Sequence, residues 1–384
     1  MPWHGWTLMD LRRNLIKDYH SQAWTMVALS EAYGVSRKTA YKWLQRFEAE
    51  GTGGLADRSR RPHHVARVEE AVRVAVCAAR HKKPDWGPRK VRSWLARQQP
   101  EVAWPSRVTI AAIWRRAGLR PAAVRRTVRV VAPSRRSPAT EPNAVWTVDF
   151  KGDFRVGSGL RCYPLTVRDA ATRYTLRCAA LAVPDYATTH RQLTRTFAEF
   201  GLPACIRSDN GPPFAGVGLG RISQLSLYWL RLDIRVERIA PGHPEQNGSH
   251  EQFHRILKAR TTRPPAATLR GQQRRFDGFC REYNEERPHE ALADTPPADH
   301  YRPSGRPWPA QLPPLEYPAH WEVRRVGSNG CIRWANDVLF LSRAFIGQDV
   351  ALEEVDDGIW TLYFARTPLA RWYARERRLR AVKD

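Results

Sequence analysis

Cysteine and long apolar runs are scarce in this sequence. Its six cysteines are scattered over 384 residues with no CxxC pair. Neither a disulfide framework nor a structural zinc site is therefore expected. The first residues, MPWHGWTLMDLRRN, lack the apolar core of a signal peptide, and no run of about 18 apolar residues occurs anywhere. These absences predict a cytoplasmic protein without a membrane partner.

Acidic residues are also few relative to basic ones. The chain has 63 Lys and Arg against 38 Asp and Glu, a formal charge of +25. Residues 1–143 hold 28 Lys and Arg and 11 Asp and Glu, which is +17 of that total. Such a charge predicts a polyanionic partner and not a small-molecule substrate. A membrane surface is also polyanionic, but no segment reads as an amphipathic anchor, so nucleic acid is favoured.

The N-terminal residues 1–55 predict a helix-turn-helix domain. In MVALSEAYGVSRKTAYKWLQRF, Gly34 permits a tight turn, and Ser36 can cap a helix with an apolar stripe. The outer face of this helix would read DNA through Ser36, Arg37, Lys38, Tyr41, Lys42 and Arg46. A helical hairpin whose basic residues merely face water is the alternative.

A second helical set is predicted over residues 65–120, with helices at 68–79, 88–97 and 106–117. Its residues expected to face outward are basic, and Arg89 and Lys90 are chosen as DNA contacts. Residues 121–143 are rich in arginine and proline and predict an extended basic linker. That linker could follow phosphates along a duplex or serve as a tether.

Residues 144–303 change to alternating strand and helix patterns. VWTVDFKGDF, CYPLTVRD and RYTLRCAALA predict three antiparallel strands. A helix, the strand ACIRSD, a helix, the strand RVERIA and a long helix from about residue 245 follow. This order predicts an α/β ribonuclease-H-like core, a mixed five-stranded sheet flanked by helices. After a proline-rich stretch, residues 319–384 predict a small β-barrel-like domain.

Three carboxylates in this core have positions suited to metal binding. Asp149 lies inside an apolar strand, Asp209 ends another strand, and Glu251 lies near the start of the long helix. If the first and fourth strands are neighbours, these carboxylates converge and repel each other unless a cation is present. Hard oxygen ligands suit Mg²⁺, with Mn²⁺ as a substitute, and two ions would catalyse phosphoryl transfer. Each residue alone could instead be an ordinary strand-end, turn or surface acid, as is expected of Asp153 and Asp169.

Four segments carry a resemblance to a family: WTVDFKG, RSDNGPPF, PGHPEQNGSHEQFHRILK and YNEERPHEAL. They resemble the integrase-like transposases of bacterial insertion sequences, the branch related to retroviral integrases, from Met26 to about Ser304. The resemblance implies that Asp149, Asp209 and Glu251 are the catalytic, metal-binding carboxylates. It also implies that Lys258 contacts the DNA end and that Asn247 shapes the approach to the active site.

The sequence departs from the family pattern in two respects. Forty-one residues separate Asp209 from Glu251, against about thirty-five in the commonest pattern, and a surface loop at PFAGVGLGRIS could hold the surplus. The zinc-binding domain of retroviral integrases is missing, so no structural metal is carried over. Glu245 is the nearest alternative to Glu251, which is favoured by Lys258 and the HEQFHRILK match.

The function expected from these features is transposition. The protein would bind the inverted-repeat ends of an insertion sequence, cleave them and join them to target DNA as a homo-oligomer in a synaptic complex. A DNA-binding regulator without catalysis is one alternative, and a ribonuclease H is another. The carboxylate triad speaks against the regulator, and the large basic N-terminal region speaks against the ribonuclease H.

Overall fold

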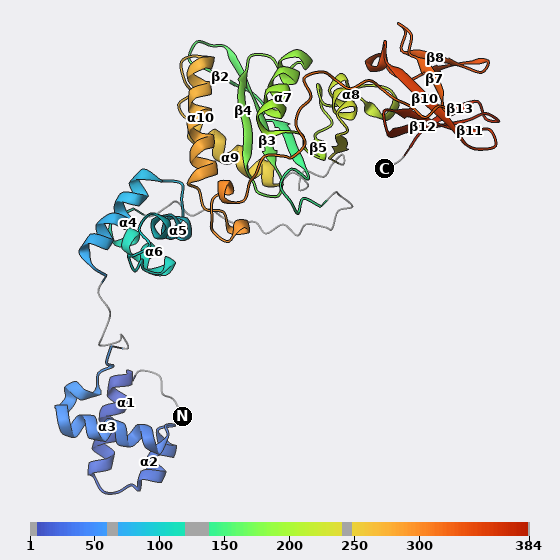
Figure 1. Ribbon diagram of the computed structural model, residues 1–384. Coiled ribbons are helices and arrows are strands. Elements are labelled where there is room, and N and C mark those ends of the chain that lie inside the picture. Colours follow the sequence, from blue (N-terminus) through green and yellow to red (C-terminus); the bar gives the residue numbers. More distant parts are fainter. Residues whose placement is uncertain (1–5, 60–67, 120–137, 240–247, 383–384) are drawn as a thin grey trace. The chain divides into compact units, whose positions relative to one another are not determined.

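The computed structural model describes residues 6–59, 68–119, 138–239 and 248–382 (Figure 1). The chain divides into two compact units, residues 1–69 and residues 70–384. Asn247, the alternative Glu245 and most of the predicted basic linker lie outside the described residues. Among the described helices, none is long and apolar enough to cross a membrane.

The first unit is a three-helix domain with the predicted helix-turn-helix. It consists of α1 (Leu8–His20), α2 (Met26–Ala32) and α3 (Arg37–Glu50). The Ser36 hydroxyl caps α3 by accepting from the Thr39 N–H at 3.2 Å. Gly34 has a φ of +62° in the turn before it, a conformation that favours glycine. Leu29, Ala40, Trp43 and Leu44 share the core with α1.

The second unit begins with another three helices, as expected. They are α4 (Glu70–Lys82), α5 (Pro88–Gln98) and α6 (Arg107–Arg116). Trp86, Val91, Ile110 and Trp114 are buried among them. Arg92 on α5 and Arg107, Arg115 and Arg116 on α6 are exposed.

Arg89 and Lys90 do not face solvent alone, as was expected, but contact the core domain. Arg89 Nε donates to Asp294 Oδ2 at 2.7 Å, and the Lys90 ammonium donates to the Pro288 carbonyl. Burial lowers the pKa of Lys90 to about 8. Both residues contact the core domain, because its acidic residues meet the polar face of α5. Helical periodicity identifies that face as polar but does not say which partner meets it.

Several further ion pairs join α4–α6 to the core. They are Lys83 with Glu282 (3.2 Å) and Glu286 (2.8 Å), Asp85 with Arg260 (2.5 Å) and Arg287 (2.7 Å), and Arg97 Nη2 with Asp299 Oδ1 (2.8 Å). Lys83 is only 3% exposed, so its ammonium is buried at this contact, whereas its partners Glu282 and Glu286 remain partly exposed.

The core is the predicted ribonuclease-H-like fold. Its strands are β1 (Trp146–Phe150), β2 (Phe154–Arg155), β3 (Arg161–Asp169), β4 (Thr175–Leu181), β5 (Cys205–Ser208) and β6 (Arg235–Arg238). The five main strands lie in the order β4-β3-β1-β5-β6, and the two-residue β2 extends the sheet beside β3. β1 pairs antiparallel with β3 and parallel with β5, which pairs parallel with β6. The sheet is therefore mixed, as expected.

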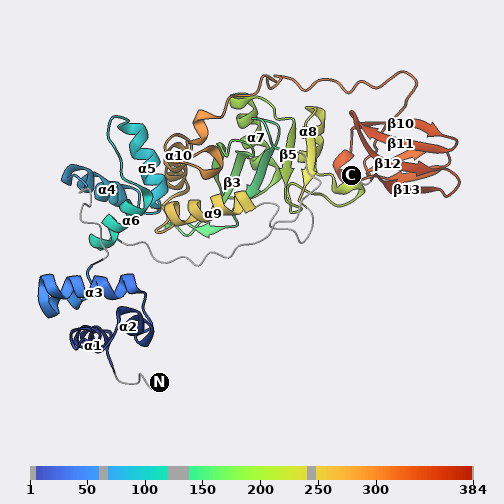
Figure 2. The ribbon, with the colours of Figure 1, turned by 90° about the horizontal axis from the view of Figure 1, so that it is seen from below.

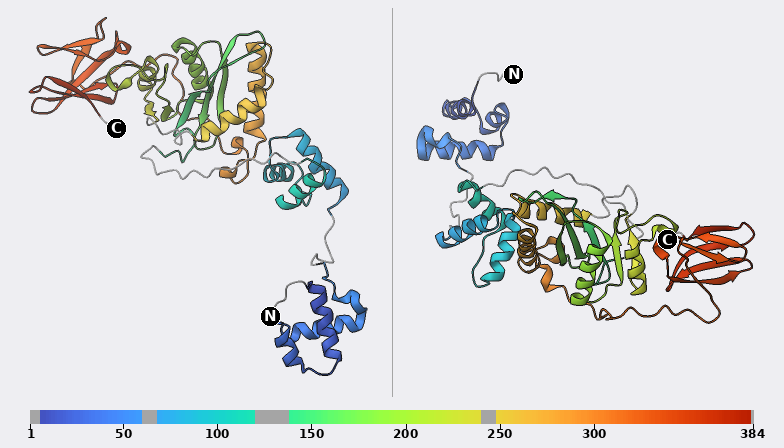
Figure 3. Two further views of the ribbon diagram at one scale, coloured as in Figure 1. Left: turned by 180° about the vertical axis from the view of Figure 1, so that it is seen from behind. Right: turned by 90° about the horizontal axis from the view of Figure 1, so that it is seen from above.

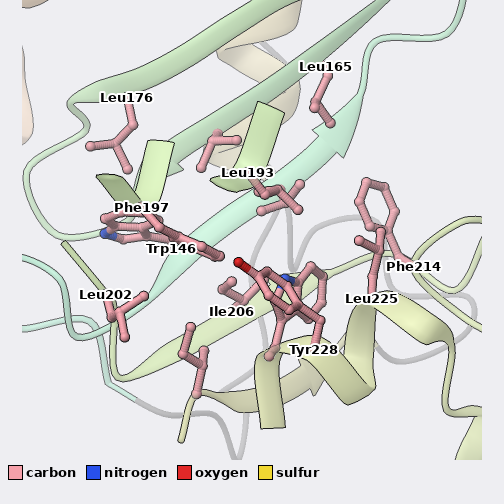
Figure 4. Close-up of a cluster of buried hydrophobic side chains, with 14 of the residues drawn as sticks. Trp146, Leu165, Leu176, Leu193, Phe197, Leu202, Ile206, Phe214, Leu225 and Tyr228 are labelled. Carbon is pink, nitrogen blue, oxygen red and sulfur yellow. The ribbon is translucent and has the colours of Figure 1, made fainter. Parts of the chain in front are cut away.

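Helices cover both faces of this sheet (Figure 2). On one face, α7 (Tyr186–Phe200) and α8 (Gln224–Arg231) pack in a cluster that includes Trp146, Leu165 and Ile206 (Figure 4). On the other face, α9 (Gly248–Thr261) and α10 (Leu269–Glu285) pack against Cys162 and Cys178. One apolar cluster thus holds β1, the strand that carries Asp149, through Trp146 and Val148, and the other holds α9 and α10 against β3 and β4.

The C-terminal domain is rich in β-strands, as expected, and the strands pair antiparallel. Its strands are β7 (Glu322–Arg325), β8 (Cys331–Trp334), β9 (Asp337–Phe340), β10 (Asp349–Asp356), β11 (Ile359–Phe364), β12 (Thr367–Tyr373) and β13 (Arg378–Ala381). Within the described part of the domain, five strands form a sheet in the order β13-β12-β11-β10-β7, and β8 pairs with β9. β13 and β7 are the two edge strands of this sheet and do not pair with each other, so the sheet is open. β8 and β9 form a separate hairpin.

The glycine-rich segment 213–223 contacts this C-terminal domain (Figure 3). The Leu219 N–H donates to the Leu341 carbonyl at 2.9 Å, and the Ser342 hydroxyl donates to the Val217 carbonyl at 3.0 Å. Gly218 has a φ of +108°, and a Cβ there would lie 2.8 Å from the Leu341 oxygen. The segment that accommodates the long Asp209–Glu251 spacing is therefore a docking element and not the free surface loop that was expected.

Candidate active site

Asp149 and Asp209 occupy matching positions on two paired strands. The parallel register of β1 and β5 runs Trp146 with Ile206, Thr147 with Arg207 and Val148 with Ser208. The next position along both strands brings Asp149 beside Asp209. Since adjacent strands lie about 4.8 Å apart, the two carboxylates are neighbours at one end of the sheet.

The two carboxylates also share a face of the sheet. Trp146 and Ile206 point into the α7–α8 cluster, and side chains alternate between faces along a strand. Asp149, three positions after Trp146, therefore points to the α9 side. Asp209 comes directly after β5 (Cys205–Ser208), and the same alternation continued by one position would place it on that side as well. Asp149 is therefore directed toward the helix that carries Glu251, and Asp209 is expected on the same side.

Glu251 lies in the first turn of α9 as the structure describes it. His250, Phe253, His254 and Leu257 form the buried stripe of this helix, and Glu251 is exposed beside that stripe. The Asp149 carbonyl accepts a hydrogen bond from the Thr166 hydroxyl at 3.1 Å, and this hydroxyl also contacts both histidines of α9. The first turns of α9 thus lie over the strand end that carries Asp149.

The Asp209 carboxyl is partly buried, and this burial changes its pKa. It raises the pKa of Asp209, and the Gly211 N–H, which donates to Oδ1 at 3.2 Å, lowers it by a smaller amount. An ionised carboxylate at this position is therefore poorly solvated by the protein alone. A bound cation would remove that penalty, so the donor set fits a divalent metal ion.

We expect Asp209→Asn to stabilise the metal-free protein at neutral pH. The folded pKa lies above the ordinary value of 3.8, so the ionised side chain destabilises the fold at any pH above the raised pKa. As the pH falls toward 3.8, wild-type Asp209 takes up a proton in the folded state and the advantage of asparagine disappears. Calorimetric melting between pH 4 and 8 measures this, with Asp153→Asn as the control. A variant no more stable than wild type at neutral pH would contradict it.

Two histidines near the carboxylates were missed by the sequence reasoning. Ligand atoms of Asp149, His250 and His254 all lie within 4.8 Å of one another. The spacing of His250 and His254, four residues apart in the first turns of α9, was a usable signal, because such residues share a helix face. Their burial, 1% and 4% exposed, follows only from the packing of α9 on the sheet.

Lys258 is exposed on α9, seven residues after Glu251. Together with Lys151, Asp153 and Thr262, it lines a small crevice between α9 and the sheet. Asp153 is ion-paired with Arg161 at 3.1 Å, and Asp169 accepts turn hydrogen bonds. These two acids therefore have the local roles expected of them.

The candidate DNA contacts of the first unit lie on α3. Ser36, Arg37, Lys38, Tyr41 and Lys42 are exposed, and Arg46 is partly exposed. Lys42 and Arg46 also lie over the Trp43 ring, with their cationic groups 4.4 and 5.1 Å from its centroid. The helix thus presents a row of positive charge beside the hydrophobic core.

The fold and the paired carboxylates define the class of an integrase core preceded by helical DNA-binding units. Models described as integrase core domain match residues 139–244 and 232–297. A helix-turn-helix domain model matches residues 11–63, and a homeodomain-like domain model matches residues 39–114. The chain therefore carries helix-turn-helix domains and an integrase core domain.

Similar proteins come from bacterial insertion elements. An uncharacterized 39.2 kDa protein of insertion element IS476 from Xanthomonas euvesicatoria is 27% identical over 231 residues, which cover 59% of this chain and 63% of that protein. An uncharacterized 31.7 kDa protein of IS407 from Burkholderia multivorans is 29% identical over 159 residues, 41% of this chain and 55% of that protein. The chain spans less than two thirds of the length of either relative.

Solved structures of viral integrases are also similar. The HTLV-2 integrase catalytic core domain in complex with magnesium is 14% identical and covers 42% of this chain and 98% of its own, with a TM-score of 0.34. A simian T-cell lymphotropic virus intasome chain is 17% identical and covers 77% of this chain and 99% of its own, with a TM-score of 0.37.

Proposed function

We propose that this protein is a transposase that binds the inverted-repeat ends of an insertion sequence, cleaves them and joins them to target DNA. The observation that carries the proposal is the juxtaposition of Asp149 and Asp209 at the paired ends of β1 and β5, under the helix that bears Glu251. The relatives from insertion elements support the same reading.

Asp149, Asp209 and Glu251 would hold two Mg²⁺ ions, or Mn²⁺ in their place. Such ions supply activation of a water or 3′-hydroxyl nucleophile and stabilisation of the leaving oxygen in phosphoryl transfer. The protein's own contribution is to fix three carboxylates on rigid elements. β1 and β5 are held by apolar clusters, and α9 is held by its buried stripe, which preorganises the donors.

Basic side chains would orient the DNA around this centre. Lys258 is on the same helix as Glu251, and its exposed ammonium can contact a phosphate near the scissile bond. Asn247 would act at the approach to the centre. On the second unit, the exposed arginines of α6 are better candidates for DNA contact than Arg89 and Lys90, which are engaged by the core.

The helix α3 would read the element ends through its exposed face. Exchanging Arg37 and Lys38 together for alanine is expected to weaken binding to element-end DNA by roughly 10- to 100-fold and to lower the salt slope by about two, because two phosphate or base contacts are lost. Fluorescence anisotropy at several salt concentrations measures both quantities.

The matched control exchanges Arg13 and Lys17 for alanine. These residues are exposed on α1 of the same unit, so the net charge changes equally. Equal loss of affinity in both double variants would show that α3 has no special role and that only total charge matters.

The proposed reaction is tested with the purified chain and duplex DNA from the flanks of its gene. Cleavage and joining that require Mg²⁺ or Mn²⁺ are the expected result. Tight end binding without nicking under any metal condition would overturn the proposal in favour of a DNA-binding regulator. Cleavage of RNA–DNA hybrids with no action on element ends would overturn it in favour of a ribonuclease H. Joining two ends would require a multimer, which mass measurement on end DNA would detect.

A further inference from the structure

The Thr166 hydroxyl determines which histidine nitrogens carry protons. Its oxygen lies 3.1 Å from the Asp149 carbonyl, 2.6 Å from His250 Nε2 and 2.8 Å from His254 Nε2. A hydroxyl has one hydrogen and two lone pairs. Since the carbonyl can only accept, the hydroxyl donates to it and accepts from both imidazoles. Each neutral imidazole then carries its hydrogen on Nε2 and a bare lone pair on Nδ1.

The two bare nitrogens have different surroundings. His250 Nδ1 is buried and has no hydrogen-bond partner within the described part of the chain. His254 Nδ1 lies 3.9 Å from Asp149 Oδ2, which is too long for a hydrogen bond. Both atoms carry lone pairs that can bind a metal cation. Asp149 Oδ2 and His254 Nδ1 would together hold a divalent ion.

The segment His250–His254 reads HEQFH and matches the H-E-x-x-H pattern of zinc peptidases. In that pattern two histidines one helical turn apart bind one zinc ion together. Here the point that both Nε2 atoms face is occupied by the Thr166 hydroxyl. The shared-zinc arrangement is therefore excluded by this packing, and His254 Nδ1 remains the nitrogen directed toward Asp149.

We propose that His254 Nδ1 is a nitrogen ligand of the metal ion held by Asp149, a role that rests on the proposed catalytic metal centre. The centre then has mixed oxygen and nitrogen donors. An imidazole ligand favours transition metals such as Mn²⁺ or Co²⁺ over Mg²⁺, which prefers oxygen. Glu251, three residues earlier on α9, lies on the same side of the helix and can share the ion.

The surroundings of His254 keep its lone pair available. The His254 side chain is only 4% exposed and is held between Thr166 and Asp149, so Nδ1 stays on the side of the carboxylate. The hydrogen bond from Nε2 to Thr166 fixes the orientation of the ring, as partners of metal-binding histidines generally do.

Mn²⁺ binding to the full-length protein tests the proposal without measuring activity. Pulsed electron paramagnetic resonance of the Mn²⁺ complex is expected to show the coupling of a directly bound imidazole nitrogen. His254→Asn offers an oxygen in place of Nδ1, so it should lose this coupling and reduce the preference for Mn²⁺ over Mg²⁺ by about tenfold. His250→Asn is the matched control and should keep the coupling, since His250 Nδ1 does not face Asp149.

The wild-type spectrum alone is decisive even if a variant does not fold. Saturable Mn²⁺ binding that Asp149→Asn abolishes, without nitrogen coupling in the wild type, would overturn the role of His254 and leave the carboxylate centre intact. Coupling that persists in His254→Asn would also overturn it. Absence of any saturable Mn²⁺ binding to the wild type would overturn the proposed metal centre, and the role of His254 with it.

Discussion

Asp149→Asn is expected to reduce cleavage and joining of element ends by about a thousandfold or more, which corresponds to about 4 kcal/mol in the activation free energy. The side chain keeps its shape but loses the charge that would hold a metal ion beside Asp209. Binding to end DNA should be unchanged, because the proposed DNA-reading helix α3 belongs to the separate first unit. Cleavage and strand-transfer rates on labelled end DNA measure the effect.

Asp153→Asn is the matched control for this substitution. Asp153 follows the same strand but is ion-paired with Arg161 and has no place in the carboxylate triad. Its loss should change the rates by no more than about twofold, since an exposed ion pair contributes little. Strand transfer that survives Asp149→Asn would refute the assignment of this carboxylate.

Asp169→Ala is expected to lower the stability of the fold and not the chemistry at the carboxylate triad. The free energy of unfolding should fall by about 3–5 kcal/mol. Asp169 is only 1% exposed. Its Oδ1 accepts from the Thr172 N–H at 2.8 Å and from the Thr172 hydroxyl at 2.7 Å, and its Oδ2 accepts from the Asn143 N–H at 2.8 Å. Alanine leaves these donors without an acceptor in a dry environment. Urea unfolding followed by tryptophan fluorescence measures the loss.

Asp169→Asn separates hydrogen bonding from charge. Its amide oxygen can replace Oδ1 toward Thr172, but its NH₂ group would face the Asn143 N–H, so we expect about half of the loss. The residual folded protein should still cleave element ends, because Asp169 does not face the triad. An alanine variant as stable as the wild type would show that water replaces the carboxylate.

The sequence was sufficient for features that depend on local pattern. The helix-turn-helix follows from Gly34, the cap at Ser36 and an apolar stripe, all within one short segment, and the structure contains it. The ribonuclease-H-like order of strands and helices follows from changes of period along the chain, and the sheet order agrees with it. Local hydrogen bonding and amphipathicity are properties of neighbouring residues, so they can be read without tertiary information.

Contacts between residues that lie far apart in the sequence could not be predicted from local patterns. The sequence predicted that Arg89 and Lys90 face outward, because their helix has a polar face there. In the structure Arg89 donates to Asp294 and Lys90 donates to the Pro288 carbonyl, which lie 205 and 198 residues later in the chain. The glycine-rich segment 213–223 appeared to be a loop, yet its Leu219 N–H bonds to Leu341 of the C-terminal domain. No local pattern encodes the partner of a polar surface, because the partner is set by the packing of whole domains.

The candidate site also combines features that the sequence predicts with features that only the tertiary structure shows. The sequence by itself determined the residue types: Asp149 in an apolar strand, Asp209 at a strand end and Glu251 early in a helix. Only the tertiary structure decided that β1 and β5 are adjacent and in register, and that α9 directs His254 at Asp149. The reason is that strand pairing and helix docking are long-range choices, made by the burial of apolar surface on both faces of the sheet. The chemistry of the site depends on distances that only those choices set.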